Sequence, residues 1–344
     1  MRINLADRIG STEEVIMKLR TIGLFVILTL GLLAGPLPVE AQQARKVYRI
    51  GNLSFRAGPS APDEAFRQAL HDLGWIEGRN IAIEYRWGAG KRDRYPALVE
   101  ELVGLKVDII VSAAGASGVR AAKKATSTIP IVMVVAADAV ENGLVASLAR
   151  PGGNVTGMTE QYSEINMKLL ELLHETLPKV TRVGFLWTSK SPVYLRTFRA
   201  AQAVAPALGL KIQSLDLRHP KEIDSVLEAA VQERAGALLV MGRVYITFGR
   251  QIAEFAAKNQ VPVFSIRSPS VEKHFGLLAY APDRIDTFRR AATYVDKILK
   301  GAKPSDLPVQ RAAKFNLLVN LKTAKQLGIT IPPEILYQAT KVIK

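Results

Sequence analysis

The chain of 344 residues contains no cysteine. This absence excludes disulfide bonds, catalysis by a thiolate and zinc sites built from cysteine, and it also excludes a lipid-modified N-terminal cysteine. A chain without cysteine is compatible with an oxidising compartment, although it does not require one.

Histidine is scarce, and its placement excludes the common metal and hydrolase motifs. The four histidines are His71, His174, His219 and His274. No two have metal-ligand spacing, and His174-Glu175 is followed by Pro178 where a zinc protease motif needs its second histidine. No serine lies in a G-x-S-x-G motif, and Gly88-Ala89-Gly90-Lys91 lacks the other residues of a phosphate loop. We therefore expect no catalytic residue, no metal and no cofactor.

Basic residues outnumber acidic ones, with 46 Lys and Arg against 31 Asp and Glu, a formal net charge of +15. The basic residues are scattered along the chain, whereas a nucleic-acid footprint would gather them in one helix or tail. We expect no nucleic-acid partner, and we interpret the charge as a surface property that aids the capture of anionic ligands.

The N-terminal segment has the three parts of a secretory signal peptide. Met17–Arg20 supplies positive charge, residues 22–33 are a twelve-residue apolar run, and Val39-Glu40-Ala41 is a small-x-small cleavage pattern. The apolar run is shorter than the roughly 20 residues that span a bilayer. We predict cleavage after Ala41 and a periplasmic protein that is not a lipoprotein. Translation could start at Met1 or at Met17, and an uncleaved membrane anchor is the alternative.

After the signal peptide, strand and helix patterns alternate with short turns, which is typical of a doubly wound α/β fold. One series of β–α units runs from Lys46 to Met158, and a second runs from Arg182 to Ile266. The residues 81–87 alternate between apolar and polar, which predicts a strand near a sheet edge. Two series of units, each with its own sheet, predict two similar lobes.

The stretch Thr128–Thr159 shows where a ligand could bind. An apolar run, Ile131–Ala136, predicts a strand buried on both faces, and Asp138 follows at its end. Ligands of open parallel sheets bind beyond the carboxyl ends of the strands, so Asp138 is a candidate contact. The alternative is that Asp138 caps a short amphipathic helix, which we expect to open at Asn142-Gly143.

Small residues follow another predicted buried strand, Val107–Val111, which comes earlier in the chain. Ser112–Gly118 leads directly into a helix over Val119–Ala125. Small side chains let a ligand approach the backbone, and the free N–H groups of a helix start favour an anion by about 0.3–1 kcal/mol. This is the best carboxylate site in the sequence. The alternative is a tight turn whose small residues are needed for packing.

Aromatic residues lie at or just beyond the ends of predicted strands. They are Phe55, Trp187 and Tyr280. In these positions they could line a cleft and stack on a flat ligand. Each alone is more often a core residue than a ligand contact, but their shared placement favours the cleft.

Four long sequence segments resemble those of a known protein family. They are LGWIEGRNIAIEYRWGAGKRDRYPALVEELVGLKVDIIV, ATSTIPIVMVVAADAVENGLVASLARPGGNVTG, YVDKILKGAKPSDLPVQ and KFNLLVNLKTAKQLGITIPPEIL. The chain resembles the ABC-transporter substrate-binding proteins whose better known members bind tryptophan or tyrosine. The resemblance implies a type I periplasmic binding fold, in which two lobes joined by three crossings close on a ligand. The crossings would fall near Gln161–Ser163, Leu278–Pro282 and Lys303–Val309.

The resemblance also implies ligand contacts, with some departures. Gly115-Ala116-Ser117 matches the small-residue helix start, but Ala116 stands where a hydroxyl residue is usual. Asp138 matches an acidic residue, and Thr188-Ser189 matches a polar pair. The largest departure is in Met241-Gly242-Arg243. The resemblance implies that amino-acid-binding members carry an aspartate here, which would pair with the ammonium group of the ligand, and Arg243 reverses that charge. We therefore hypothesise a small carboxylate ligand, aromatic or bearing a second anionic group.

These inferences define one set of expectations. The first lobe would comprise residues 45–162 and 281–303, and the second would comprise residues 163–280 and 304–344. The protein would be a monomer that delivers its ligand to an inner-membrane permease with its ATPase, or a periplasmic sensor that feeds a signalling receptor. The hinge residues would be Gln161, Tyr162 and Ser163, and the ligand contacts would be Ser54, Phe55, Gly115, Ala116, Ser117, Asp138, Trp187, Thr188, Ser189, Arg243 and Tyr280.

Overall fold

The computed structural model describes Met17 and residues 46–344. The predicted signal peptide, with its cleavage site after Ala41, lies outside the described residues apart from Met17. Val47–Lys344 form one compact unit that contains two β-sheets. Among the described residues, no helix combines the length and the apolar character needed to cross a bilayer.

The first sheet has six strands in the order β11-β5-β4-β3-β1-β2, and every pairing is parallel. In chain order the strands are β1 (Tyr48–Ser54), β2 (Ile81–Trp87), β3 (Ile109–Ala113), β4 (Ile131–Ala137), β5 (Val155–Glu160) and β11 (Gln310–Arg311). The strand β2 lies at an edge of this sheet, as its alternating pattern predicts. Helices are needed on both faces, because a parallel sheet is apolar on both.

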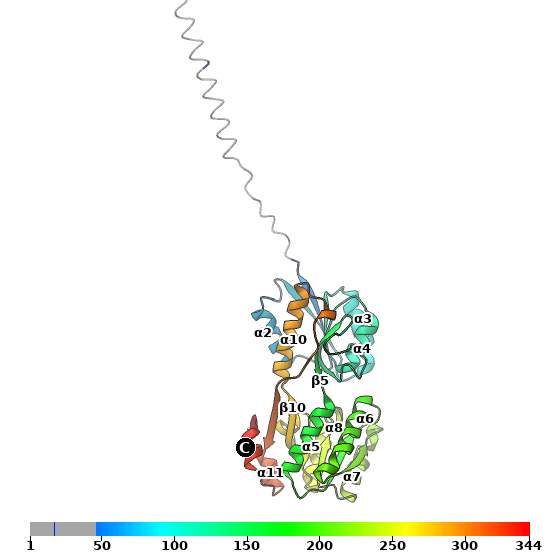
Figure 1. Cartoon of the computed structure of the whole chain (residues 1–344), viewed down its shortest axis with the longest axis vertical. Coiled ribbons are helices and arrows are strands. Elements are labelled where there is room, and N and C mark those ends of the chain that lie inside the picture. Colours follow the sequence, from blue (N-terminus) through cyan, green and yellow to red (C-terminus); the bar gives the residue numbers. More distant parts are fainter. Residues whose placement is uncertain (1–16, 18–45) are drawn as a thin grey trace, which may run out of the picture. The chain divides into compact units, whose positions relative to one another are not determined.

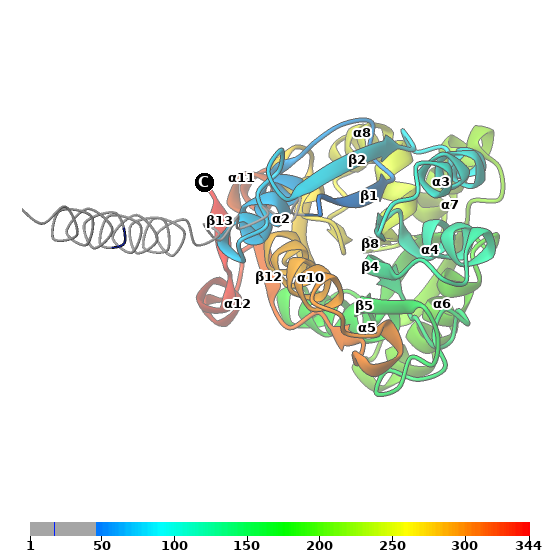
Figure 2. The same ribbon diagram turned by 90° about the horizontal axis from the view of Figure 1, so that it is seen from above.

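Two pairs of helices cover the first sheet. The helices are α2 (Ala61–Asp72), α3 (Tyr95–Gly104), α4 (Gly115–Ala125) and α10 (Arg284–Leu299), with short 3-10 turns η1 (Arg92–Arg94) and η4 (Pro304–Asp306). Figure 2 shows α10 on one side of β4 and β5 and α4 on the other. Val132 and Val134 of β4 pack on the α2–α10 side, whereas Ile131 and Met133 pack on the α3–α4 side. The strand is therefore buried on both faces, as its apolar run predicts.

The second sheet has seven strands in the order β13-β12-β10-β9-β8-β6-β7, with β10 and β12 antiparallel and the other pairs parallel. In chain order the strands are β6 (Arg182–Trp187), β7 (Lys211–Asp216), β8 (Ala237–Val240), β9 (Val263–Ser265), β10 (Gly276–Pro282), β12 (Phe315–Asn320) and β13 (Lys341–Ile343). The fold is thus the predicted α/β architecture with two mostly parallel sheets.

Helices also cover both faces of the second sheet. One face packs against α5 (Tyr162–Thr176), α6 (Pro192–Val204), α11 (Leu321–Gln326) and α12 (Pro333–Gln338), and the other against α7 (Ile223–Gln232) and α8 (Gly242–Asn259). The short α9 (Pro269–Glu272), η2 (Ala205–Leu208) and η3 (Pro220–Glu222) complete the set. We call the first sheet with α2, α3, α4 and α10 the first lobe, and the second sheet with the remaining α-helices the second lobe.

Three segments connect the lobes (Figure 1). The first leads from β5 through Gln161 into α5, and the second leads from β10 through Asp283 into α10. The third lies between β11 and β12 rather than at Lys303–Val309, where the sequence placed it. The later position arises because Thr156 donates a hydrogen bond to the Leu307 carbonyl and β11 pairs with β5, which keeps residues 307–311 on the first sheet.

The expected helix opening at Asn142-Gly143 is wrong, because the structure has turns there. The Asn142 side chain donates hydrogen bonds to the carbonyls of Ala137 and Asp138, and Gly143 has a positive φ of 65°. Both features favour a turn over a helix. Leu144 nevertheless packs in the core, as its apolar character predicts.

Candidate functional site

A pocket of about 180 Å³ lies between the two lobes and is lined by residues of both. The first lobe supplies the loops after β1, β2 and β3 and the start of α10. The second lobe supplies the starts of α6 and α8 and the loop after β9. These are the carboxyl ends of parallel strands, where open α/β sheets bind ligands.

Aromatic side chains form the apolar part of this lining. They are Phe55, Tyr95, Tyr162, Tyr194 and Phe288. The rings of Tyr162 and Tyr194 stack with their centroids 6.2 Å apart, so the first crossing and the second lobe meet in one aromatic surface. Such walls can hold a planar ligand.

Five arginines supply the charge of the pocket, and its lining among the described residues contains no Asp, Glu or His. Arg56, Arg92 and Arg284 come from the first lobe, and Arg243 and Arg267 come from the second. Guanidinium groups bind carboxylates and phosphates through paired hydrogen bonds, so the arrangement is suited to anions. It offers neither a nucleophile with an adjacent base nor a metal-binding group, and we derive no reaction from it.

Two of the arginines are neutralised by carboxylates behind the pocket wall. Arg56 lies 3.3 Å from Asp63, and Arg284 pairs through both guanidinium nitrogens with Glu160, whose side chain is only 1% exposed. Burial disfavours the Arg284 charge, but Glu160 outweighs this effect, and the pKa of Arg284 is raised. These two pairs hold the charges in place without an added ligand.

Arg267 adjoins these pairs but has no carboxylate within ion-pair distance among the described residues. Its Nε is buried without a hydrogen-bond partner. Burial and the neighbouring Arg284 lower the pKa of Arg267. Its stem passes over Gly242, where a Cβ would lie 3.2 Å from the Arg267 Cδ, so a glycine there makes room for the arginine. We call Arg56, Arg267 and Arg284 the paired end of the pocket, because Asp63 and Glu160 adjoin it.

Arg92 and Arg243 line the same pocket without a carboxylate at ion-pair distance among the described residues, and we call these two arginines the unpaired end. Neither makes an ion pair among the described residues, and burial together with Arg243 lowers the pKa of Arg92. The backbone N–H of Arg243 donates to the Tyr194 hydroxyl at 2.8 Å, which fixes the start of α8 beside the aromatic surface. Two like charges from opposite lobes therefore line one pocket.

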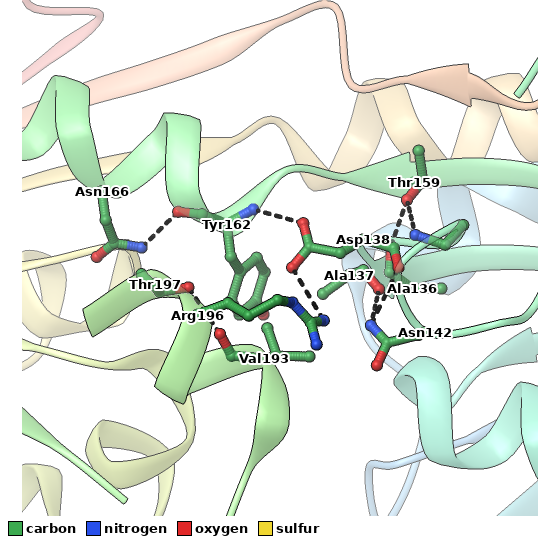
Figure 3. A network of polar contacts seen from close by, with 11 residues as sticks. Ala136, Ala137, Asp138, Asn142, Thr159, Tyr162, Asn166, Val193, Arg196 and Thr197 are labelled. Carbon is green, nitrogen blue, oxygen red and sulfur yellow. Dashed lines mark hydrogen bonds and ion pairs between the residues drawn. The ribbon is translucent and has the colours of Figure 1, made fainter. Parts of the chain in front are cut away.

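Asp138 lies beside the first crossing and connects both lobes (Figure 3). Its carboxylate accepts a hydrogen bond from the Tyr162 N–H at 3.2 Å, and its Oδ2 lies 3.9 Å from Nη2 of Arg196 on α6. Burial raises the pKa of Asp138 to about 6, although the Tyr162 hydrogen bond and Arg196 oppose the shift. Asp138 does not line the pocket. Because no helix follows it, the alternative of a helix cap is wrong.

The structure brings four of the predicted residues into the pocket lining. They are Phe55, Gly115, Arg243 and the hinge residue Tyr162. Gly115 begins α4 with a positive φ of 68°, so it supplies the open backbone that the small-residue stretch predicts. Gly118, one turn later, serves packing instead, because a Cβ there would lie 2.4 Å from the Ala114 Cβ.

The other residues of these stretches lie behind the pocket or beside it. Ser54 is buried and accepts a hydrogen bond from the Arg56 N–H. Ala116 and Ser117 belong to the first turn of α4 but do not line the pocket. The hinge residue Gln161 lies in a separate groove at the crossings, and Ser163 lies in the first turn of α5.

Four further predicted contacts do not line the pocket. Trp187 is 4% exposed, stacks on Phe198 and donates its indole N–H to Ser214, so it belongs to the core. The next residue, Thr188, is half-buried, and the Ser189 N–H donates to Asp216 at 2.8 Å. Tyr280 stacks on Phe315 in the groove beside the crossings.

Sequence reasoning missed the four other arginines and most of the aromatic lining. Arg267 and Arg284 follow the buried strands β9 and β10 within two residues. A charged residue just after a buried strand is the same pattern that makes Asp138 a candidate contact, so this pattern could have identified both arginines. Arg92 lies in a polar loop after β2, and Tyr194 lies inside α6. Nothing in the local sequence separates these two from ordinary surface or core residues.

Comparison with known proteins gives a consistent result. The profile of the family described as "ABC transporter substrate binding protein" matches residues 59–343. A tyrosine-binding protein of Clostridioides difficile (strain R20291) is 26% identical over 267 residues, which cover 77% of this chain and 76% of that protein.

Solved structures agree with this match. An ABC domain from Streptococcus pneumonia in complex with L-Trp has a TM-score of 0.78 at 24% identity, covering 87% of this chain and 100% of that one. The ligand-free, open structure of a Clostridium difficile substrate binding protein has a TM-score of 0.70 at 25% identity, covering 87% and 100% of the two chains. A conserved domain protein from Vibrio cholerae has a TM-score of 0.77 at 27% identity, covering 86% and 100%.

Proposed function

Because this chain belongs to the family of ABC transporter substrate-binding proteins, we propose that it is the solute-binding component of an ABC importer and captures a small organic carboxylate between its lobes. The family consists of binding proteins, not enzymes. The observation that carries the proposal is the pocket between the lobes, which joins an aromatic wall to five arginines.

Closure of the lobes would retain the ligand. The pocket takes residues from both lobes, and only three segments of chain connect them. A ligand that contacts both lobes stabilises the closed state by as much as its affinities for the two states differ. A relative in this family has been described in a ligand-free, open form, which supports closure as the response of this fold.

The import role places the protein outside the cytoplasm. The predicted signal peptide would direct it to the periplasm, where it would work as a monomer and pass its ligand to an inner-membrane permease driven by an ATPase. Two relatives are described with tyrosine or L-Trp, so an aromatic carboxylate is the ligand class that they and the aromatic wall together support.

The experiment is small-angle X-ray scattering with thermal unfolding across a library of aromatic and aliphatic carboxylates. At least one compound is expected to reduce the radius of gyration and raise the melting temperature of the mature chain. A matched library of neutral and cationic compounds serves as the control. If scattering and melting stay unchanged across the carboxylates, the proposed function is wrong.

A further inference from the structure

We infer that the ligand carries two anionic groups and no cationic group, with a planar ring between the anions. This inference rests on the proposed function, because it specifies the ligand class of the same pocket. It differs from the amino acids with which the relatives are described, since those carry an ammonium group.

The charge of the pocket is the first step. Five arginines line it, and among the described residues only two of them have a carboxylate within 4 Å. Asp63 pairs with Arg56, and Glu160 pairs with Arg284. Three positive charges are therefore left without a counter-ion among the described residues. The Nε of one of them, Arg267, is buried without a hydrogen-bond partner, which is costly, and a fixed anion offsets that cost.

The distribution of this charge is the second step. Arg267 has no ion-pair partner among the described residues, although it is grouped with the paired arginines Arg56 and Arg284. The other two arginines without a partner, Arg92 and Arg243, make up the unpaired end. The buried Nε of Arg267 without a hydrogen-bond partner is an open donor at the first end. Two guanidinium groups that adjoin each other form an open site at the second end. Each end can therefore take one anionic group.

The absence of a place for an ammonium group is the third step. A zwitterionic amino acid needs an acceptor for its cation, and the pocket lining among the described residues has no carboxylate. Glu160 is already bound through both oxygens to Arg284, and Asp138 contacts Arg196 outside the lining. An ammonium group in this pocket would face arginines and would be repelled.

The position of the arginines on opposite lobes is the fourth step. Arg92, Arg56 and Arg284 of the first lobe line the same pocket of about 180 Å³ as Arg243 and Arg267 of the second. Without an anion, like charges from the two lobes oppose closure most strongly at the unpaired end, because Asp63 and Glu160 already neutralise Arg56 and Arg284 at the other. An anion at each end converts repulsion into attraction across the cleft, so the two anionic groups themselves drive closure.

Isothermal titration calorimetry with defined probes tests the inference. The probes are benzene-1,4-dicarboxylate and 4-carboxyphenyl phosphate as ring dianions, benzoate as the monoanion, and L-tryptophan and L-tyrosine as zwitterions. We expect both dianions to bind at least ten-fold more tightly than benzoate and both amino acids to bind more weakly than either dianion. The ratio between the two dianions distinguishes a carboxylate from a phosphate as the second anionic group.

Variants assign the effect to the unpaired end. Arg92→Gln and Arg243→Gln are each expected to weaken the binding of both dianions at least ten-fold, because each variant removes one guanidinium group from an open anion site. Arg250→Gln is the matched control, because Arg250 lies on the same helix as Arg243 with its side chain 88% exposed, and it is expected to change dianion binding less than two-fold. Melting curves of all variants verify folding.

The alternative outcomes separate this inference from the proposed function. If L-tryptophan or L-tyrosine binds more tightly than either dianion, or if Arg243→Gln does not weaken dianion binding, the inference is wrong and the proposed function stands. If benzoate binds as tightly as the dianions, the inference is also wrong. If no probe binds and none changes the scattering profile, both are contradicted.

Discussion

The two ends of the pocket contain the same side-chain type in different electrostatic settings. At the paired end, Arg284 is held by the buried Glu160, and Arg56 is held by Asp63. At the unpaired end, neither Arg92 nor Arg243 has an ion-pair partner in the part of the chain that the structure describes, and tyrosines lie near both. The first setting resembles a structural ion pair, whereas the second leaves its charge for a ligand.

This difference separates residues that hold the pocket from residues that bind in it. Removing a partner from a buried ion pair destabilises the fold, because the remaining charge is left uncompensated. Removing a charge that has no partner costs little stability and reduces binding instead. Variants at the paired end should therefore lower mainly the free energy of unfolding, whereas variants at the unpaired end should lower mainly the affinity for the ligand.

The largest expected effect is on the paired end. Glu160→Gln leaves Arg284 buried without its counter-ion and should lower the free energy of unfolding by about 3–5 kcal/mol. Urea unfolding monitored by circular dichroism measures this change. The control is Glu101→Gln, because Glu101 pairs with Arg86 at 2.6 Å but is 54% exposed, and it should cost less than about 1 kcal/mol. Equal costs for both variants would contradict the assignment of Glu160 to a buried structural pair.

A smaller effect is expected at Asp138, and it depends on pH. The folded-state pKa of about 6 lies above the ordinary value of 3.8 for an aspartate, so the charged carboxylate opposes folding at high pH. Asp138→Asn should therefore raise the free energy of unfolding by about 1–2 kcal/mol at pH 8, since one pKa unit corresponds to about 1.4 kcal/mol. Asparagine also tolerates the positive φ of 45° at this position.

The pH window supplies the control for this variant. The advantage of Asp138→Asn should shrink as the pH falls from about 6 to below 3.8, because the wild-type carboxyl group is then protonated in both states. Urea unfolding at pH 8, 6 and 4 measures it. An advantage that is the same at pH 4 and pH 8 would show that the charge of Asp138 is not its cause.

The smallest expected effect is on the stability of the unpaired end. Arg92→Gln removes one of two opposed like charges, so the free energy of unfolding of the ligand-free protein should stay within about 1 kcal/mol of wild type or rise slightly. The same unfolding assay measures it beside Glu160→Gln. A loss as large as that of Glu160→Gln would mean that Arg92 is structural and that the two ends do not differ.

The fold could be predicted from the sequence because buried parallel strands are encoded locally. The run Ile131–Ala136 shows its burial on both faces, and residues 81–87 show an edge strand. The turn after Asp138 could not be predicted, because it depends on a side-chain hydrogen bond from Asn142 to nearby carbonyls.

The pocket lies at strand ends that the sequence singles out, but most of its lining comes from other residues. Trp187 stands at a strand end as predicted, yet its side chain points to the same face as Phe185, toward α6 and the core. Alternation along the strand, rather than nearness to its end, decides which side chains reach the pocket. Arg267 and Arg92 line one pocket only because the two lobes face each other, and no local pattern carries that information.

The most direct test is mass spectrometry of the small molecule that remains bound when the mature protein is purified without denaturation. The account predicts an aromatic compound with two acidic groups and no amine, at a stoichiometry that falls in Arg92→Gln and Arg243→Gln but not in Arg250→Gln. Recovery of tryptophan, tyrosine or another zwitterionic amino acid at the same stoichiometry in all these proteins would contradict it.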